Sequence, residues 1–390
     1  MQDAYLVAYN RSAVTKAKKG GFRFMRSDDL AVMIIQGLLA KVPEVSGSLI
    51  DDIIVGCANP EGEQGLQIGR QIALRAVGIS APGMTVNRYC ASGLETIAIA
   101  TAKIRAGMGE CFIAGGIESM SQIPMEGYKL ALNYDVADQH PDYIIGMGLT
   151  AEAVAKKYHI TREDQDAFSF RSHALANKAQ ELGYSESEIQ AIDVTEVLVE
   201  QNKRIEKKYT VKADDGIRKD TTLEGLSTLK PVFALGGSVT AGNSSQTSDG
   251  AAFFLVMSER LVRSLGITPI GRLVSCSVAG VEPLYMGIGP CEAIPLALRQ
   301  AQLKLDDISL IELNEAFAAQ SLAVIRQAGL NPDIVNVNGG AIALGHPLGC
   351  SGARLSMSLM NELDRRKQQY GIVTACVGGG QGIAGVIERF

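Results

Sequence analysis

The chain has 390 residues, 46% of them hydrophobic and 20% charged, with a formal net charge of −5. This length suits two or three domains with a large buried core. The negative net charge gives the chain no overall basic surface, which argues against nucleic acid as a partner. Seven cysteines without C-x-x-C spacing and four histidines without paired spacing argue against a disulfide framework and a zinc site.

The first part of the chain alternates apolar strand patterns with helical ones. Strands are predicted at residues 4–9, 53–56 and 111–114, and helices at residues 28–42 and 66–77. Ser27 or Asp28 is expected to cap the first helix, and the third strand is expected to end in Gly115-Gly116. Strands and helices that alternate at this spacing predict a parallel sheet in an α/β fold.

Cys90 is predicted to lie in a sharp turn between a short strand that ends at Val86 and a helix that runs to Gly107. The small residues 91–93 let a substrate or another part of the chain approach the sulfur closely. The unpaired N–H groups at the start of a helix favour a thiolate over a thiol. A buried structural cysteine is the alternative, and the turn alone does not exclude it.

Residues 121–242 are more polar and less regular than the segments on either side. A helix is predicted at residues 163–182, capped at Thr161 with Asp164 three residues on. The mixed charges of residues 196–224 are typical of a solvated surface. The alternative is that cations of this segment contact a phosphorylated ligand. These cations are Lys203, Arg204, Lys207, Lys208, Arg218 and Lys219.

The second half of the chain repeats the first. The sequence L-I-D-D-I at 49–53 returns as K-L-D-D-I at 304–308, each ahead of a short apolar strand. The strand that ends in A-G-G at 114–116 returns as A-C-V-G-G-G at 375–380. We predict two α/β halves about a pseudo-twofold axis, so that equivalent turns meet at their interface. The predicted domains are 1–120 with 243–266, an inserted loop domain at 121–242, and 267–390.

The turn equivalent to the Cys90 turn contains His346, which is held between Gly345 and Pro347 at the entrance of a helix. A lone histidine is more often a satisfied core residue, but one fixed opposite a cysteine is a candidate general base. Cys350 is a rival nucleophile. It falls at the start of the helix, where we expect it to be buried.

Two further groups follow apolar strands of the second half. Asn314 lies at the end of a strand where α/β sites assemble, and it can hold a water or an oxygen or simply form a turn. Cys376 ends another strand and offers a second thiol for general acid and base catalysis. The glycines at 378–380 present backbone N–H groups to a developing oxyanion.

Four motifs in this order resemble the thiolase family, and the resemblance covers essentially the whole chain. They are N-R-Y-C-A-S-G, N-E-A-F-A, G-H-P-L-G-C-S-G-A-R and C-V-G-G-G-Q-G. The resemblance implies a duplicated five-layer α-β-α-β-α core with a loop domain that covers coenzyme A. No metal or redox cofactor is implied, and coenzyme A is a substrate.

The resemblance also implies a role for each residue of the site. Cys90 is the acylated nucleophile, His346 activates it, and Cys376 protonates the departing enolate and later deprotonates the attacking thiol. Asn314, through a bound water, forms one oxyanion hole with His346, and the N–H groups of Cys90 and Gly380 form the other. The coenzyme A contacts implied are Ser245, Met147, Ala316 and Phe317 along the pantetheine, and Arg218 at the nucleotide end.

The segments 147–152 and 240–250 resemble the degradative 3-ketoacyl-CoA thiolases of β-oxidation more than the acetoacetyl-CoA synthesising branch. An acetoacetyl-CoA thiolase that runs the condensation shares every catalytic residue and remains the alternative. A decarboxylating ketoacyl synthase is expected to lack Cys376, and a non-catalytic acyl-CoA-binding relative is expected to lack one of the three catalytic side chains.

The resemblance implies a homodimer or homotetramer and leaves open whether a subunit of a β-oxidation complex binds. The sequence shows no signal segment and no apolar run of membrane-spanning length. We therefore expect a cytoplasmic protein without membrane insertion.

Overall fold

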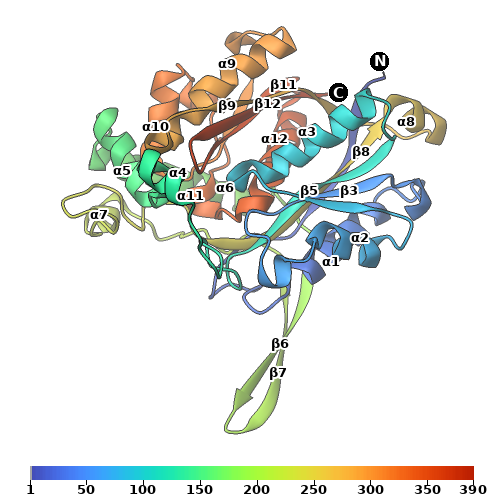
Figure 1. Cartoon of the computed structure of the whole chain (residues 1–390), viewed down its shortest axis with the longest axis horizontal. Helices are drawn as coiled ribbons and strands as arrows, with labels where there is room; N and C mark the ends of the chain where they lie inside the picture. Colours follow the sequence, from blue (N-terminus) through green and yellow to red (C-terminus); the bar gives the residue numbers. More distant parts are fainter. Residues whose placement is uncertain (1) are drawn as a thin grey trace.

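The computed structural model describes residues 2–390, except for the side chain at position 200. The strands of the first half are β1 (Ala4–Arg11), β2 (Thr15–Lys16), β3 (Asp52–Gly56), β4 (Gly83–Val86), β5 (Cys111–Ser119) and β8 (Ser248–Ser258). Those of the second half are β9 (Gly271–Gly280), β10 (Leu310–Leu313), β11 (Tyr370–Val377) and β12 (Gln381–Arg389). All ten belong to one sheet, which crosses the molecule in Figure 1.

The strand pairing shows the same pattern twice. In the first half β4 and β5 pair with β3 in parallel, and β8 pairs antiparallel with both β5 and β1. In the second half β10 pairs with β11 in parallel, and β12 pairs antiparallel with both β11 and β9. A parallel bridge from Ile311 to Val335 takes the place of β4. The two halves join where β1 meets β9, at Leu6 and Gly271. The predicted internal repeat is confirmed.

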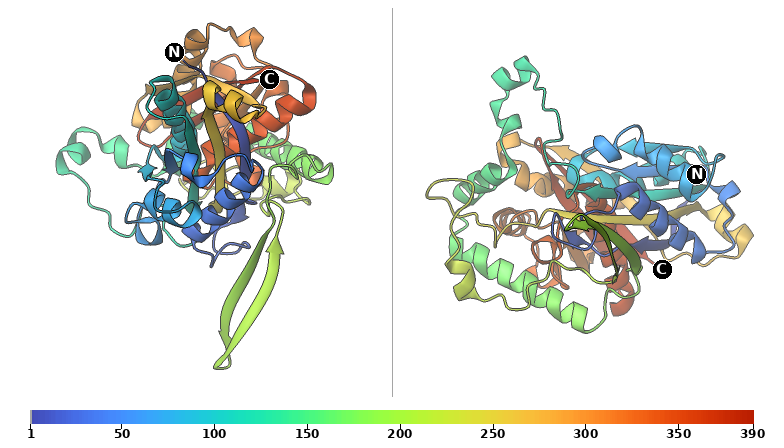
Figure 2. Two further views of the ribbon diagram at one scale, coloured as in Figure 1. Left: turned by 90° about the vertical axis from the view of Figure 1, so that its right-hand side faces the viewer. Right: turned by 90° about the horizontal axis from the view of Figure 1, so that it is seen from below.

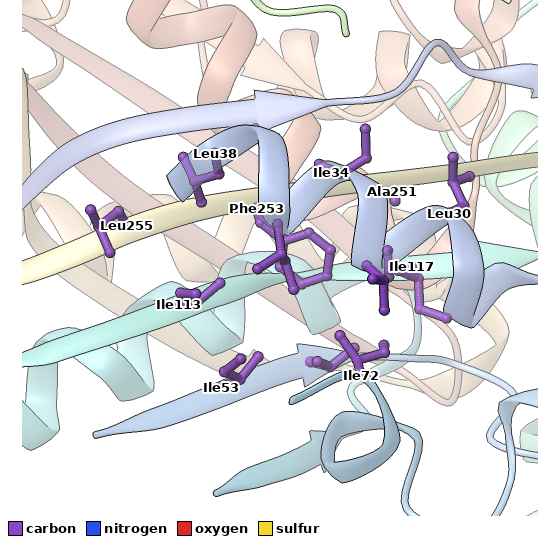
Figure 3. Close-up of a cluster of buried hydrophobic side chains, with 14 of the residues drawn as sticks. Leu30, Ile34, Leu38, Ile53, Ile72, Ile113, Ile117, Ala251, Phe253 and Leu255 are labelled. Carbon is purple, nitrogen blue, oxygen red and sulfur yellow. The ribbon is translucent and has the colours of Figure 1, made fainter. Parts of the chain in front are cut away.

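Helices cover the outer face of each half of the sheet, and two further helices fill the space between the two halves. α1 (Ser27–Ala40) and α2 (Ile68–Ala76) pack on the outer face of the first half, where Leu30, Ile34 and Leu38 lie over Phe253 (Figure 3). α9 (Gly289–Ala301) and α10 (Ala318–Gln327) cover the outer face of the second half. α3 (Ser92–Arg105) and α12 (Leu348–Arg366) share one core with strands of both halves. The fold is the five-layer α-β-α-β-α arrangement.

Glycines let α3 and α12 cross at their N-terminal ends. A Cβ added to Gly93 would lie 2.6 Å from the backbone nitrogen of Ala353, and one added to Gly352 would meet the backbone of Leu94. Only glycine permits so close an approach of two backbones. Each helix follows a turn that sequence analysis singled out, so this crossing brings the Cys90 turn and the His346 turn to the same place.

The middle of the chain forms an irregular layer and a projecting hairpin. Its elements are α4 (Tyr134–Gln139), α5 (Met147–Lys157), α6 (Arg162–Glu181), β6 (Ile192–Glu200), β7 (Lys203–Val211) and α7 (Leu223–Ser227). The predicted capping box of Thr161 and Asp164 is present at the start of α6. β6 and β7 form a two-stranded ribbon that extends far from the body (Figures 1 and 2). Most of its charged side chains are exposed, as a solvated surface requires.

Three predicted boundaries were wrong. Ser27 and Asp28 lie inside α1 rather than capping it, and the Asp28 carboxylate instead pairs with Arg26 and Arg75. α2 begins at Ile68 because Leu66 and Gln67 have positive φ angles of 50° and 59°. β5 does not end at Gly115-Gly116 but runs on to Ser119, since its pairing with β8 continues through both glycines. The remaining helices are α8 (Glu259–Leu265) and α11 (Ala341–Leu344).

Candidate active site

The turn that carries Cys90 is tight and strained. It is a single 3-10 turn, Tyr89–Ala91, between the end of β4 and the start of α3. Ser92 Oγ accepts a hydrogen bond from the Arg88 N–H at 2.9 Å and donates one to the Tyr89 carbonyl at 2.7 Å. Tyr89 is held at a φ of 43°, a conformation that costs about 1–2 kcal/mol for a residue with a side chain. Such strain is typical of a functional turn.

The Cys90 sulfur faces the second half of the molecule. It accepts a hydrogen bond from the Gly378 N–H, and its side chain packs against a cluster that includes Leu348, two residues beyond His346. Desolvation by the surrounding protein raises the pKa of Cys90 to about 11, and the nearby Glu118 carboxylate adds to this. The expectation of a resting thiolate is therefore wrong, because desolvation outweighs the helix end. The thiol needs a base.

His346 has the hydrogen bonds of such a base. Its Nδ1 lies 2.6 Å from Ser351 Oγ, and that hydroxyl donates to the Pro347 carbonyl at 2.8 Å. Because the Ser351 hydroxyl hydrogen is donated to Pro347, Ser351 Oγ can only accept a hydrogen bond from the ring. The proton of the neutral imidazole therefore lies on Nδ1, and Nε2 carries a lone pair. Burial, and then the positive charge of Arg354, lower the pKa of His346 to about 3. The imidazole is neutral at physiological pH.

Asn314 lies beside this lone pair. Its Nδ2 is 3.2 Å from His346 Nε2, and its backbone N–H donates to the Thr374 carbonyl at 2.9 Å. Its side chain is fully buried, and Oδ1 has no hydrogen-bond partner within the described part of the chain. A buried amide oxygen without a protein partner fits a site for an ordered water. The structure brings Asn314 and His346 together, as predicted from two separate motifs.

Cys376 lies near the end of β11, next to the glycine turn. It is fully buried, and burial raises the pKa of its thiol above the usual range, with a further increase when Cys90 is ionised. The two sulfurs are therefore close enough to interact. Gly379 and Gly380 have φ angles of 81° and 88°, and a Cβ on Gly380 would collide with the Val281 carbonyl. This turn keeps its backbone bare beside both sulfurs.

Four of the five predicted coenzyme A contacts lie around Cys376. Met147, Ala316 and Phe317 pack in one cluster with it, and the Ser245 N–H donates to the Ala316 carbonyl at 2.9 Å. Arg218 is not part of this cluster. Its side chain is exposed, and its backbone N–H donates to Nδ1 of His173 at 3.2 Å.

Two residues of this region, Ser351 and Glu118, were not predicted from the sequence. Ser351 lies five residues after His346, at the end of the first turn of α12. From this position its hydroxyl contacts the imidazole ring. Glu118 is a lone carboxylate in an otherwise apolar strand, which was the available signal. Gly378 was predicted only as one of the glycines at 378–380 and not as a hydrogen-bond donor to Cys90. Cys350 is 1% exposed in the first turn of α12, so its predicted burial is confirmed.

Within residues 2–390, no group of three or more His, Cys, Asp or Glu side chains has the geometry to hold a metal ion. None of the described helices is long and apolar enough to cross a membrane.

Comparisons with known proteins agree with this geometry. The family model described as "Thiolase, N-terminal domain" matches residues 4–260, and "Thiolase, C-terminal domain" matches residues 267–389. A 3-ketoacyl-CoA thiolase of Bacillus subtilis is 50% identical over 390 residues, which cover 100% of both chains. One of Chromohalobacter salexigens is 42% identical and covers 100% of this chain and 98% of its own. The crystal structure of the Bacillus anthracis acetyl-CoA acetyltransferase is 38% identical, with a TM-score of 0.90 over 100% of this chain and 99% of that one. The chain therefore belongs to the thiolase family.

Proposed function

We propose that this chain is a 3-ketoacyl-CoA thiolase, an acyltransferase that cleaves 3-ketoacyl-CoA with coenzyme A to acetyl-CoA and a shortened acyl-CoA in fatty acid β-oxidation. The observation that carries the proposal is the meeting of the Cys90 turn and the His346 turn at the crossing of α3 and α12, with Asn314 Nδ2 3.2 Å from His346 Nε2 and with Cys376 close enough to Cys90 for the two thiols to interact. The 50% identity to a curated 3-ketoacyl-CoA thiolase supports the same conclusion.

In the first half-reaction His346 Nε2 takes the Cys90 proton, and the thiolate attacks the 3-keto carbon of the substrate. The bond between C2 and C3 then breaks, which leaves the shortened acyl group on Cys90 as a thioester. The electron pair of the broken C2–C3 bond passes to the acetyl-CoA enolate, and the Cys376 thiol protonates this enolate at C2. Burial keeps Cys376 protonated and His346 neutral, the two states that this step requires.

In the second half-reaction the Cys376 thiolate takes the proton of an incoming coenzyme A thiol. The coenzyme A sulfur attacks the acyl carbon on Cys90, the thioester bond to Cys90 breaks, and the imidazolium of His346 returns its proton to the Cys90 sulfur. Every proton that leaves a group is restored after both half-reactions, and no electron is transferred to a cofactor. We therefore propose coenzyme A as a substrate and no resident cofactor.

Two oxyanions develop in this scheme and each needs donors. We assign one to His346 with a water held by Asn314, whose Oδ1 lacks a protein partner, and the other to the N–H groups of Cys90 and Gly380. Removal of one such donor typically costs about 2.7–4 kcal/mol of transition-state stabilisation. Ser245, Met147, Ala316 and Phe317 are proposed to line the pantetheine, and Arg218 to contact the nucleotide end.

The second candidate is acetoacetyl-CoA thiolysis or condensation, which the likeness to the Bacillus anthracis acetyl-CoA acetyltransferase favours. An assay of thiolysis against 3-ketoacyl-CoA substrates from four to sixteen carbons separates the two, with release of acetyl-CoA as the readout. We expect turnover beyond four carbons. Activity confined to acetoacetyl-CoA would replace the first candidate with the second.

We also propose a cytoplasmic homodimer or homotetramer. The family resemblance supports the oligomer, and the bacterial sources of the curated relatives support the compartment. Sedimentation of the purified chain tests the oligomeric state, and co-purification tests whether a subunit of a β-oxidation complex binds.

A further inference from the structure

Two buried carboxylates hold the loop that carries His346, here called the His346 loop and defined as residues 340–349. Glu315 accepts a hydrogen bond from the Ile342 N–H at 3.2 Å, near one end of the loop. Glu118 accepts one from the Gly349 N–H at 2.8 Å, at the other end. Glu315 is fully buried and Glu118 is 1% exposed. Every hydrogen-bond donor that these carboxylates have among the described residues is neutral.

Glu118 accepts hydrogen bonds at both of its oxygens. Oε2 accepts from the N–H groups of Ala58 and Gly349, both at 2.8 Å. Oε1 accepts from the Asn59 N–H at 3.3 Å and from Gln64 Nε2 at 2.8 Å. The Cys57 thiol adds a weaker contact to Oε1 at 3.8 Å. Burial raises the pKa of Glu118, and the four N–H donors lower it. A protonated carboxyl would turn its own hydrogen toward one of these donors, so the arrangement fits the ionised form. Gly349 is the second residue of α12, so the positive end of that helix faces the charge.

The Glu118 contact crosses the interface between the two halves. Glu118 lies on β5 of the first half, whereas Gly349 lies in the second half, three residues beyond His346. The carboxylate also lies close enough to Cys90 to raise the pKa of its thiol. Tyr89 and Cys376, which also interact with Cys90, and His346, its proposed base, are neutral at physiological pH. Among these groups, Glu118 is the one whose charge raises the pKa of the Cys90 thiol.

We propose that Glu118 is a positioning residue for catalysis: it fixes the His346 loop across the interface and, through its contact with Ala58 in the cluster that Cys90 packs against, places a negative charge near the Cys90 thiol. This rests on the proposed roles of Cys90 and His346. A buried anion without a cationic partner is costly to maintain, and here four backbone and amide donors offset that cost. Glu315 performs the anchoring part at the other end of the loop, through Ile342.

The test compares Glu118→Gln with a matched control, Asp249→Asn. Asp249 is 2% exposed on β8, one register position from Glu118, and it too accepts only from neutral donors, those of Ser119 and Ser121. Among the described residues, its carboxylate has no hydrogen bond to the His346 loop. Two quantities are measured for each variant: kcat and KM for thiolysis, and the pH midpoint of Cys90 alkylation by iodoacetamide, read on the Cys90 peptide by mass spectrometry.

For Glu118→Gln we expect a loss of kcat on the order of 10²-fold, because small displacements of catalytic groups have effects of that size, with KM little changed. We expect the alkylation midpoint to move to lower pH, because the charge that opposes the thiolate is gone. Asp249→Asn should change neither quantity. The proposal is overturned by a wild-type kcat and midpoint in Glu118→Gln, or by equal changes in Asp249→Asn.

If Glu118→Gln does not fold, Glu118→Asp keeps the charge but withdraws the carboxylate from Gly349. We then expect a lower kcat with an unchanged alkylation midpoint, and a wild-type kcat would again overturn the proposal. Alkylation needs no substrate. The wild-type chain could lack thiolysis while the pH midpoint of Cys90 alkylation still moves to lower pH in Glu118→Gln. In that case the proposed function fails, and the placement of the Glu118 charge stands.

Discussion

Nδ2 of Asn314 lies 3.2 Å from Nε2 of His346, although the two residues belong to different motifs in different loops. The amide donates to the imidazole only because Nδ1 carries the ring proton, and Ser351 fixes that proton. Asn314 therefore also reports the tautomer. In the proposed reaction His346 accepts a proton at Nε2, so the contact between Nδ2 and Nε2 must then break.

Cys90→Ala is expected to abolish formation of the acyl-enzyme, because the thiolate at this position is the proposed nucleophile. Cys376→Ser should still acquire an acyl group from acyl-CoA, since that step does not need a carbon leaving group to be protonated. Mass spectrometry after incubation with acetyl-CoA measures both. Acylation of the Cys90→Ala variant at any other residue would contradict the assignment.

Ser351→Ala is expected to lower kcat by about 10–100-fold, by analogy with the loss when the hydrogen-bond partner that orients a metal-bound histidine is removed. Without Ser351 Oγ the Nδ1 proton of His346 loses its acceptor, so the other tautomer becomes accessible and blocks the base. Steady-state kinetics measure the effect.

Ser356→Ala is the control for this change. Ser356 is buried on the same helix, and its hydroxyl donates to the Gly352 carbonyl at 2.8 Å without touching His346. Equal losses of kcat in the two variants would show that Ser351 acts only through the stability of α12.

The sequence predicted the meeting of the Cys90 and His346 turns, because the internal repeat placed both at equivalent points of two halves. It did not predict how the turns are held. Glu118 and Gly349 are 231 residues apart in the chain, and their hydrogen bond depends on tertiary packing that no local pattern reveals.

The resting state of Cys90 was mispredicted for a related reason. A helix start argues for a thiolate from local structure alone. Burial raises the pKa of Cys90 to about 11, and the cluster that Cys90 packs against contains Ala58 of the first half and Leu348 of the second, which only the folded molecule brings together. The hairpin of β6 and β7 escaped prediction because its mixed charges hide the alternation of its few buried side chains.

Gly380→Ala is expected to reduce both stability and kcat. Its φ of 88° costs an alanine about 1–2 kcal/mol, and the new Cβ would also collide with the Val281 carbonyl and so shift the turn beside Cys376. Gly266→Ala is the control. Gly266 has a φ of 67° but has no atom near the position of a Cβ, so only the backbone strain should appear. Thermal unfolding and kcat are measured for both, and a wild-type kcat in Gly380→Ala would exclude this turn from the site.

His173→Asn is expected to make the protein more resistant to acid. Burial, and then the charges of Arg218 and Lys16, lower the pKa of His173 to about 4 from 6.5. The unfolded chain therefore binds a proton first as pH falls, and folding stability declines from about pH 6.5 until pH 4, by up to about 3 kcal/mol at 1.36 kcal/mol per pH unit. Asparagine can still accept from the Arg218 N–H but does not titrate, so urea unfolding should show a smaller loss of stability between these pH values. His140→Asn, at an exposed position, should follow the wild type. An identical decline in His173→Asn and wild type would show that His173 protonates equally in the folded and unfolded chain.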